Sequence, residues 1–98
     1  MTYFLSLEAE TELAEATDFY ALNVSHKVAE NFLGKFVEKA ELLVEFHGLG
    51  APTSKGRRLF RIGRYPYSIL YRANQGVIYI SAIAHQSRRP KYWQTRKP

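Results

Sequence analysis

The residues that could take part in chemistry lie in the second half of the chain, where arginines surround a single histidine. His85 could act as a general acid or base in phosphodiester cleavage, while nearby arginines stabilise the charge that develops on phosphorus. On this hypothesis Arg61 and Arg88 bind the scissile phosphate, and Tyr92 or Trp93 stacks on a base. The structural alternative is a histidine at the end of a strand that hydrogen-bonds the following segment and fixes its direction.

Positive and negative residues are segregated along the sequence. All nine Asp and Glu residues precede Phe46, whereas eleven of the fourteen Lys and Arg residues follow position 50. A guanidinium group binds phosphate or carboxylate through two hydrogen bonds, so this uncompensated positive charge indicates a surface for an anionic partner. Scattered, solvated charge is the alternative. The expected partner-binding residues are Arg57, Arg58, Arg61, Arg64, Arg72, Arg88, Arg89, Tyr92 and Trp93.

Other kinds of site lack the residues that they need. The three histidines are scattered and the chain has no cysteine, so we expect no metal site. Ser81 and Ser87 have no evident base and orienting partner for nucleophilic catalysis. The segment 47–56 lacks the spacing of a phosphate-binding loop, and we expect no cofactor. Tyr67 and Tyr71 are expected in the core, with only their hydroxyl groups exposed.

Two helices are predicted in the acidic half of the chain. Apolar residues at helical spacing indicate a first helix over residues 8–22, and Ser25 is placed to cap a second over residues 26–46. The short connection between them predicts an antiparallel helix hairpin. The inward-facing residues are expected to be Ala9, Leu13, Ala16 and Tyr20 in the first helix and Ala29, Phe32, Leu33, Phe36, Ala40 and Leu43 in the second.

Four strands complete the predicted fold. They are expected over residues 3–7, 57–62, 66–72 and 77–85, with a hairpin turn before the last strand in which Gly76 adopts positive φ. The order β-α-α-β-β-β predicts an α+β fold, with the helix hairpin on one face of a twisted, mostly antiparallel sheet. The arginines are expected along the other, partly open face. In the last strand, alternation directs Ile78, Ile80, Ala82 and Ala84 toward the helices and Val77, Tyr79, Ser81, Ile83 and His85 away from them.

Length and composition predict one domain over residues 1–98, with a basic tail over residues 85–98. The absence of cysteine favours a reducing compartment over secretion. No apolar run approaches the roughly 20 residues that a membrane-spanning helix needs. We therefore expect a cytoplasmic protein that has no membrane partner.

Two segments resemble the RelE/ParE superfamily, the toxins of bacterial type II toxin–antitoxin modules. The closing motif of that superfamily is similar to residues 82–93, AIAHQSRRPKYW. Its central hairpin, a basic strand and short turn followed by a strand with a hydrophobic-Tyr-Arg ending, is similar to residues 57–72, RRLFRIGRYPYSILYR. With the glutamate-rich first helix and the capped second helix, the resemblance covers nearly the whole chain.

The resemblance implies a toxin neutralised by a cognate antitoxin, with one of two targets. RelE-like members cleave mRNA on the ribosome without a metal, using basic and tyrosine residues of the open sheet face, whereas ParE-like members inhibit DNA gyrase. Arg61 stands where RelE-like proteins carry a lysine, but Ser68 stands where they place an arginine, and Tyr92 or Trp93 falls near their C-terminal tyrosine. This partial match favours the ParE-like hypothesis. A RelE-like endoribonuclease and a non-toxic nucleic-acid-binding module are the alternatives.

Overall fold

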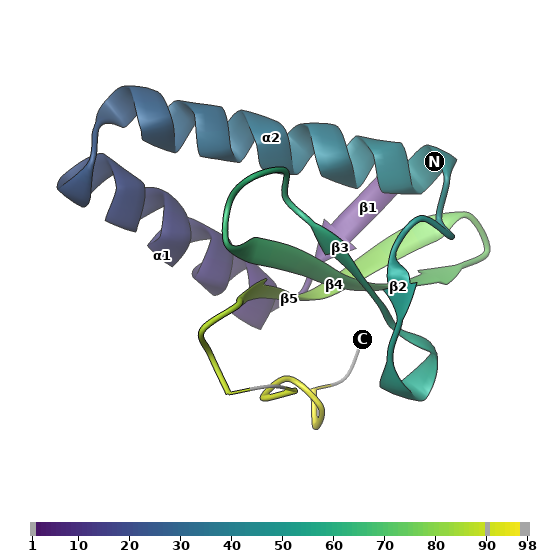
Figure 1. The fold of residues 1–98 in the computed structure, drawn as a ribbon. Helices are drawn as coiled ribbons and strands as arrows, with labels where there is room; N and C mark the ends of the chain where they lie inside the picture. The colour runs from purple at the N-terminus through teal and green to yellow at the C-terminus, as the bar shows by residue number, and fades with distance from the viewer. Residues whose placement is uncertain (1, 90, 97–98) are drawn as a thin grey trace.

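A computed structural model of the chain describes residues 2–89 and 91–96, so positions 90, 97 and 98 of the predicted tail lie outside the described residues. Two helices lie on a five-stranded sheet whose strand order is β1-β5-β4-β3-β2 (Figure 1). β1 runs parallel to β5, and the other neighbours are antiparallel, which confirms the predicted α+β fold. The strands are β1 (Thr2–Leu5), β2 (Ala51–Pro52), β3 (Arg58–Arg61), β4 (Tyr67–Asn74) and β5 (Val77–His85).

The helix hairpin consists of α1 (Leu7–Asn23) and α2 (His26–Glu45), which pack on one face of the sheet. The side-chain oxygens of Ser6 and Ser25 each accept a hydrogen bond of 3.1 Å from a backbone N–H in the first helical turn. Each cap satisfies an amide group that the helix itself leaves free. The predicted inward-facing residues are buried or half-buried with one exception, because Leu33 lies at the flank of the apolar stripe and is 40% exposed. No helix in the described part of the chain is long and apolar enough to cross a membrane.

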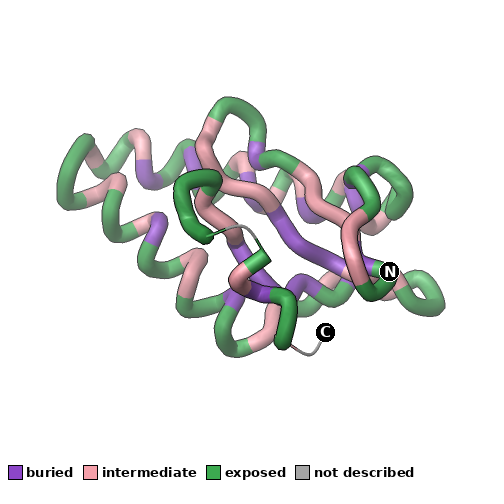
Figure 2. The backbone as a smooth tube through the Cα atoms, turned by 60° about the horizontal axis from the view of Figure 1, so that its bottom comes forward, coloured by how far each residue is buried: buried purple, intermediate pink, exposed green. Residues whose placement is uncertain are grey.

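The core lies between the hairpin and the central strands, where burial is concentrated in Figure 2. Phe32 and Phe36 of α2 pack there with Tyr71 of β4. The ring of Tyr67 lies 5.3 Å from that of Phe32, so both tyrosines belong to the core as predicted. The expectation that the hydroxyl of Tyr71 is exposed is wrong, because the whole residue is buried.

The turns around the sheet differ from the prediction in one place. The hairpin between β4 and β5 is a two-residue turn with positive φ at Gln75 (50°) and Gly76 (80°), the left-handed geometry predicted for the glycine. The segment 47–56, expected to be a loop, contains strand β2 and a single 3-10 turn at Ser54–Gly56. Strand β2 is an edge strand, and Pro52 is tolerated there because an outward-facing residue needs no ladder hydrogen bond.

A β-bulge at Ser81 reverses part of the alternation predicted for β5. Ser81 has no partner in β4, because the residues on either side of it pair with consecutive residues of that strand. One extra residue exchanges the two faces of a strand, so the prediction that Ala82 and Ala84 face the helices is wrong. Ile83 packs in the helix-facing core instead, and the ring of His85 lines a cavity beside α1.

The sheet face opposite the helices is partly covered by residues 86–89 and 91–96, here called the C-terminal arm (yellow in Figure 1). The arm is a series of turns in which backbone N–H groups donate to carbonyl groups three residues earlier. Trp93 packs against Leu70 and Ala82 and is only 3% exposed. The prediction of a partly open face lined by arginines is therefore wrong where the arm lies.

Candidate functional site

The site begins at an unpaired stretch of the sheet edge. β1 has only four residues and pairs with the first half of β5, as far as Ile80. The chain then enters α1 after Ser6, so the first turns of the helix pass beside the second half of β5. Glu12 on this helix accepts a hydrogen bond of 2.9 Å from the backbone N–H of Ile83. A side-chain carboxylate thus takes the place of a neighbouring strand at this point.

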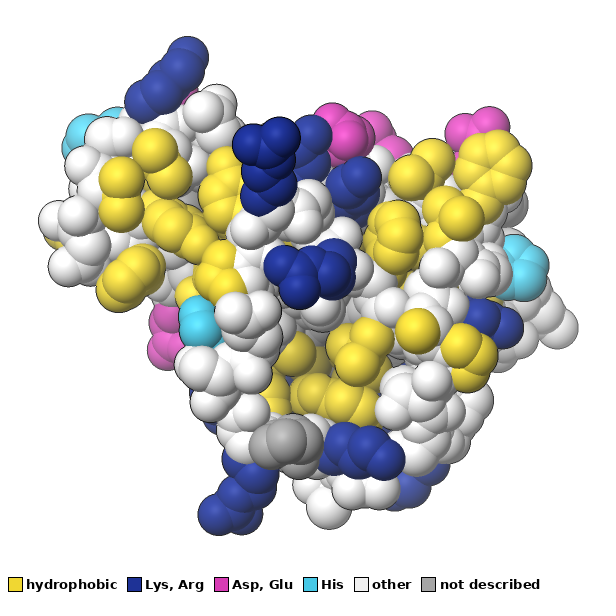
Figure 3. All heavy atoms as spheres, in the orientation of Figure 1, with side chains coloured by type: hydrophobic (Ala, Val, Ile, Leu, Met, Phe, Trp, Pro, Cys, Tyr) yellow, Lys and Arg dark blue, Asp and Glu magenta, His cyan; other side chains and the backbone are white. Residues whose placement is uncertain are grey.

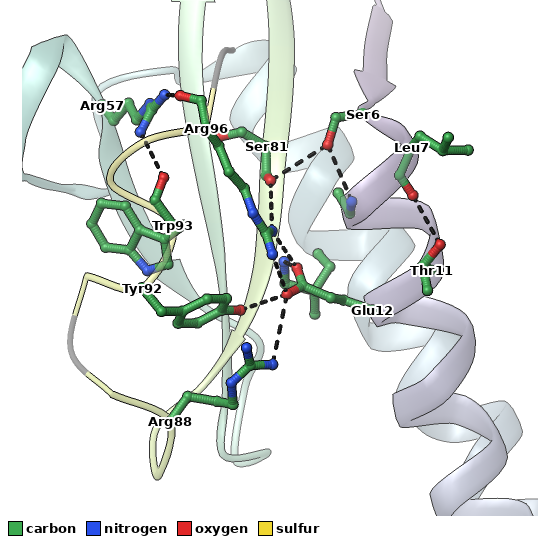
Figure 4. A network of polar contacts seen from close by, with 12 residues as sticks. Ser6, Leu7, Thr11, Glu12, Arg57, Ser81, Arg88, Tyr92, Trp93 and Arg96 are labelled. Carbon is green, nitrogen blue, oxygen red and sulfur yellow. Dashed lines mark hydrogen bonds and ion pairs between the residues drawn. The ribbon is translucent and has the colours of Figure 1, made fainter.

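The carboxylate of Glu12 is also the attachment point of the C-terminal arm (Figure 4). Arg96 donates to both of its oxygens, at 2.9 and 3.0 Å, in a bidentate pair. The hydroxyl of Tyr92 donates to it at 2.7 Å, and the guanidinium of Arg88 lies 3.9 Å away. The Glu12 side chain is only 10% exposed. We call this carboxylate with its arm contacts the Glu12 hub.

The hub shifts the protonation equilibria of its members. Burial works to raise the pKa of Glu12, but the hydrogen bonds from Arg96, Tyr92 and the Ile83 N–H outweigh it, so the pKa lies below its ordinary value. Burial raises the pKa of Tyr92, and the hydrogen bond to Glu12 raises it further. The hydrogen bond to Glu12 also raises the pKa of Arg96. The hub is therefore a carboxylate, a neutral phenol and a guanidinium at neutral pH.

Arg57 holds the arm from the opposite side. Its guanidinium donates to the carbonyl of Trp93 at 3.2 Å and to the carbonyl of Arg96. Arg57 is 2% exposed, and its pKa is lowered by burial and by the positive charges of Arg72 and Arg96. Within the described residues, the acceptors of this buried charge are thus two carbonyl oxygens of the arm.

The aromatic residues of the arm face inward or are covered by arginine. Arg88 lies over the ring of Tyr92, with its guanidinium carbon 3.9 Å from the ring centroid, and Arg96 lies 5.1 Å from the same centroid. Trp93 is buried on the sheet. Trp93 therefore has no ring face free for stacking, and Tyr92 is half-buried with Arg88 over its ring.

A cavity of about 310 Å³ lies between the arm and the sheet. Its floor includes Leu59, Ala84 and Trp93, and its border is formed by three cationic side chains, here called the basic rim. Figure 3 shows this apolar hollow with Lys and Arg side chains beside it. The basic rim consists of Arg88, Arg89 and Lys91, all of them exposed. The arrangement can bind a group that is both apolar and anionic.

The imidazole of His85 is engaged by the residue two positions later. Its Nδ1 accepts a hydrogen bond of 2.9 Å from the backbone N–H of Ser87 and lies 2.7 Å from the Ser87 hydroxyl. Because a backbone N–H can only donate, the neutral ring carries its proton on Nε2. This geometry matches the structural alternative, in which His85 fixes the direction of the following segment. Among the residues described, no three His, Asp or Glu side chains gather as metal ligands would.

Comparison with known proteins identifies the family. The model for the ParE toxin of type II toxin–antitoxin systems, parDE, matches residues 3–90. This chain belongs to the ParE toxin family. A solved structure described as the chromosomal ParDE TA system from P. aeruginosa is similar to it, with 25% sequence identity and a TM-score of 0.74, over 87% of this chain and 95% of the other. No curated protein matches the sequence significantly.

Within this ParE fold, the predicted partner-binding residues have different environments. Arg64 and Arg89 are exposed, as expected for partner contact. Arg58 donates to the carbonyl of Gly50 at 2.8 Å, and Arg72 donates to the carbonyl of Lys55 at 2.5 Å, so both hold neighbouring loops. Arg57 and Trp93 were expected on the partner-binding surface, but both are buried and do not lie on it.

Three of the four residues expected to act together in catalysis, His85, Arg88 and Tyr92, line the cavity between the arm and the sheet. Cross-strand pairing places Arg61 beside Ser68 on the arm side of the sheet, whereas the ring of His85 packs against Tyr67 at 4.8 Å. Arg88 and Tyr92 contact each other and the Glu12 hub. The structure thus brings three of the four predicted residues to one cavity, but only Arg88 and Tyr92 among them are in direct contact.

Sequence reasoning missed Glu12, the residue with the most arm contacts. In the sequence it is one of several glutamates of the first helix, and its separation from Arg96 by 84 residues gives no sign of their contact. A signal did exist, because no carboxylate follows residue 50, so any ion pair of the eleven cations there must be formed with an acidic residue of the first half.

Proposed function

We propose that this ParE family toxin arrests growth by binding and inhibiting DNA gyrase, without catalysing a reaction itself. The observation that carries the proposal is the family match over residues 3–90. Inhibition of gyrase is what the resemblance to ParE-like toxins implies, and it requires a binding surface rather than a catalytic centre. The exposed basic rim beside an apolar cavity supplies such a surface.

The state of the candidate catalytic groups supports a non-catalytic role. A general base needs a free lone pair, but the Nδ1 lone pair of His85 is occupied by Ser87 and its Nε2 carries the proton. The Tyr92 hydroxyl is bound to Glu12, and one face of its ring is covered by Arg88. The endoribonuclease alternative would require all of these contacts to be exchanged for contacts with RNA.

We further propose that a cognate antitoxin neutralises the toxin. The matching family is the ParE toxin of type II toxin–antitoxin systems, and the similar structure from P. aeruginosa is described as a chromosomal ParDE TA system. The uncompensated positive charge of residues 51–98 favours an antitoxin segment that carries Asp and Glu residues. Such a segment would cover the basic rim.

The decisive experiment is a supercoiling assay with purified gyrase, run beside a translation assay with programmed ribosomes. We expect inhibited supercoiling and intact mRNA. Arg89→Gln removes one exposed cation from the basic rim and should raise the toxin concentration needed for half inhibition. Lys27→Gln removes one exposed cation from α2 and serves as the matched control, with no expected effect. Uninhibited gyrase at excess wild-type toxin would refute the proposal.

The antitoxin proposal is tested by co-expression with the product of the adjoining gene. A stable complex should form, and its dissociation constant should increase with salt concentration because charged surfaces are paired. Arg89→Gln should weaken the complex more than Lys27→Gln does. A complex that is insensitive to salt and to Arg89→Gln would contradict charge pairing at the basic rim.

A further inference from the structure

The C-terminal arm contains no regular helix or strand, so its position depends on a small number of contacts. The backbone N–H of Gln86, at the start of the arm, donates to the carbonyl of Pro66 at 2.9 Å, but the backbone hydrogen bonds beyond Gln86 are local turns that would form equally well if the arm left the sheet. Among the described residues, its side-chain contacts with the rest of the domain are the Glu12 hub, the packing of Trp93 and hydrogen bonds through Arg57, Lys55 and Ser81. Arg57 donates to two carbonyl groups of the arm, Lys55 donates to the carbonyl of Gln94 at 3.0 Å, and the carbonyl of Ser81 accepts from Arg96. A segment held in this way can detach without global unfolding.

Electrostatics make Glu12 the decisive contact among these. Among the described residues, Glu12 alone forms ion pairs with arginines of the arm, namely Arg88 and Arg96. The buried guanidinium of Arg57 holds the other side of the arm, and its pKa is lowered by burial and, to a smaller extent, by the positive charges of Arg72 and Arg96. Without the Glu12 charge, docking of the arm would bring its arginines against the domain with no carboxylate to compensate their charge.

The contacts of Glu12 also fix the direction of the arm. The bidentate pair with Arg96 sets the distance and angle of the arm's end, and the hydrogen bond from Tyr92 fixes its middle. The bulge at Ser81 adds to this, because its carbonyl, freed from the ladder, accepts a hydrogen bond of 3.1 Å from Arg96. The basic rim lies on the same arm, so its geometry is set by these contacts.

We infer that Glu12 is a positioning residue, which acts on the toxin's target only by holding the C-terminal arm and its basic rim in place. It makes no contact with the target itself, because its side chain is only 10% exposed beneath the arm. The effect on gyrase rests on the function proposed above, whereas the effect on the arm does not.

The test compares Glu12→Gln with Glu10→Gln, an exposed residue of the same helix that undergoes the same change in charge. Trp93 is the only tryptophan of the chain, so its fluorescence reports the docking of the arm. Quenching of Trp93 by acrylamide measures its exposure, and the α-helical circular dichroism signal measures whether the rest of the domain stays folded. The concentration for half inhibition of gyrase measures function.

For Glu12→Gln we expect docking of the arm to weaken by at least about tenfold, since charge-assisted hydrogen bonds become neutral ones. Trp93 should become accessible to acrylamide while the helical signal is kept, and the half-inhibition concentration should rise by at least about tenfold. Tyr92→Phe removes one hydrogen bond to the hub and should shift the same quantities less. Glu10→Gln should behave like the wild type.

Two results would overturn the inference. One is a Trp93 that stays as shielded in Glu12→Gln as in the wild type, and the other is a released Trp93 with unchanged inhibition of gyrase. If Glu12→Gln does not fold, Tyr92→Phe decides the matter by the same criteria. If the wild type does not inhibit gyrase, the proposed function fails, and the Trp93 measurements still decide whether Glu12 positions the arm.

Discussion

Replacing Tyr71 by phenylalanine should destabilise the whole domain, because its hydroxyl joins the end of α2 to the sheet. The hydroxyl donates to the carbonyl of His47 at 2.6 Å and accepts from the backbone N–H of Gly50 at 2.9 Å. Both groups belong to the segment between α2 and β2. The ring itself is fully buried, so the substitution removes two hydrogen bonds and leaves the packing of the ring in place.

The magnitude follows from the loss of two buried hydrogen bonds. Each contributes about 1 kcal/mol, and a buried N–H left without an acceptor adds a further penalty, so the free energy of unfolding should fall by about 3 kcal/mol. For a domain of this size, that loss corresponds to a decrease in Tm of roughly 10–20 °C. It is a large share of the roughly 5–15 kcal/mol that stabilises a typical domain.

Urea denaturation followed by circular dichroism measures this change. Tyr79→Phe is the matched control, because this ring is 37% exposed and its substitution should change the free energy of unfolding by less than about 0.5 kcal/mol. A Tyr71→Phe protein within about 0.5 kcal/mol of the wild type would refute the reasoning that the two hydrogen bonds hold this segment.

Three further predictions concern the same core and the arm. Gly50→Ala should destabilise the domain by about 1–3 kcal/mol in urea denaturation, because the added Cβ would lie 2.7 Å from the Tyr71 hydroxyl and 2.9 Å from the Leu59 carbonyl. Trp93→Ala should cost about 3 kcal/mol by the same assay, since it empties the space between arm and sheet. The pKa of Glu12 is lower in the folded protein than the ordinary carboxyl value of 4.5. The stabilisation that the Glu12 carboxylate gives to the docked arm is therefore complete above pH 4.5 and is lost as the pH falls through the lower folded pKa. Acrylamide quenching of Trp93 should therefore rise in acid below that value in the wild type, and an unchanged Trp93 down to pH 2 would contradict this.

The local features of the fold could be predicted from the sequence. Ser25 caps α2, Gly76 adopts positive φ in the hairpin turn, and the apolar spacing of both helices places the core stripe correctly apart from Leu33. Each of these depends on residues within one or two turns of one another, so propensity and periodicity are sufficient. The resemblance to ParE-like toxins was confirmed by the family match.

The predictions for the site were less successful because they treated each residue as an exposed group. Arg57 and Trp93 were expected to contact a partner, yet both are buried between arm and sheet. A long amphipathic side chain is buried when the fold supplies acceptors for it, and the acceptors of Arg57 are carbonyl groups of the arm, 36 and 39 residues away. No local pattern encodes such a pairing.

The sequence by itself therefore determined the helix hairpin, the turn between β4 and β5, and the separation of acidic from basic residues. The tertiary structure decided the direction of side chains after the bulge at Ser81 and the docking of the arm through Glu12, which contacts Ile83 and Arg96 across 71 and 84 residues of chain. The physical reason is that periodicity reports only local geometry, whereas burial of a charge depends on which partner the completed fold brings to it.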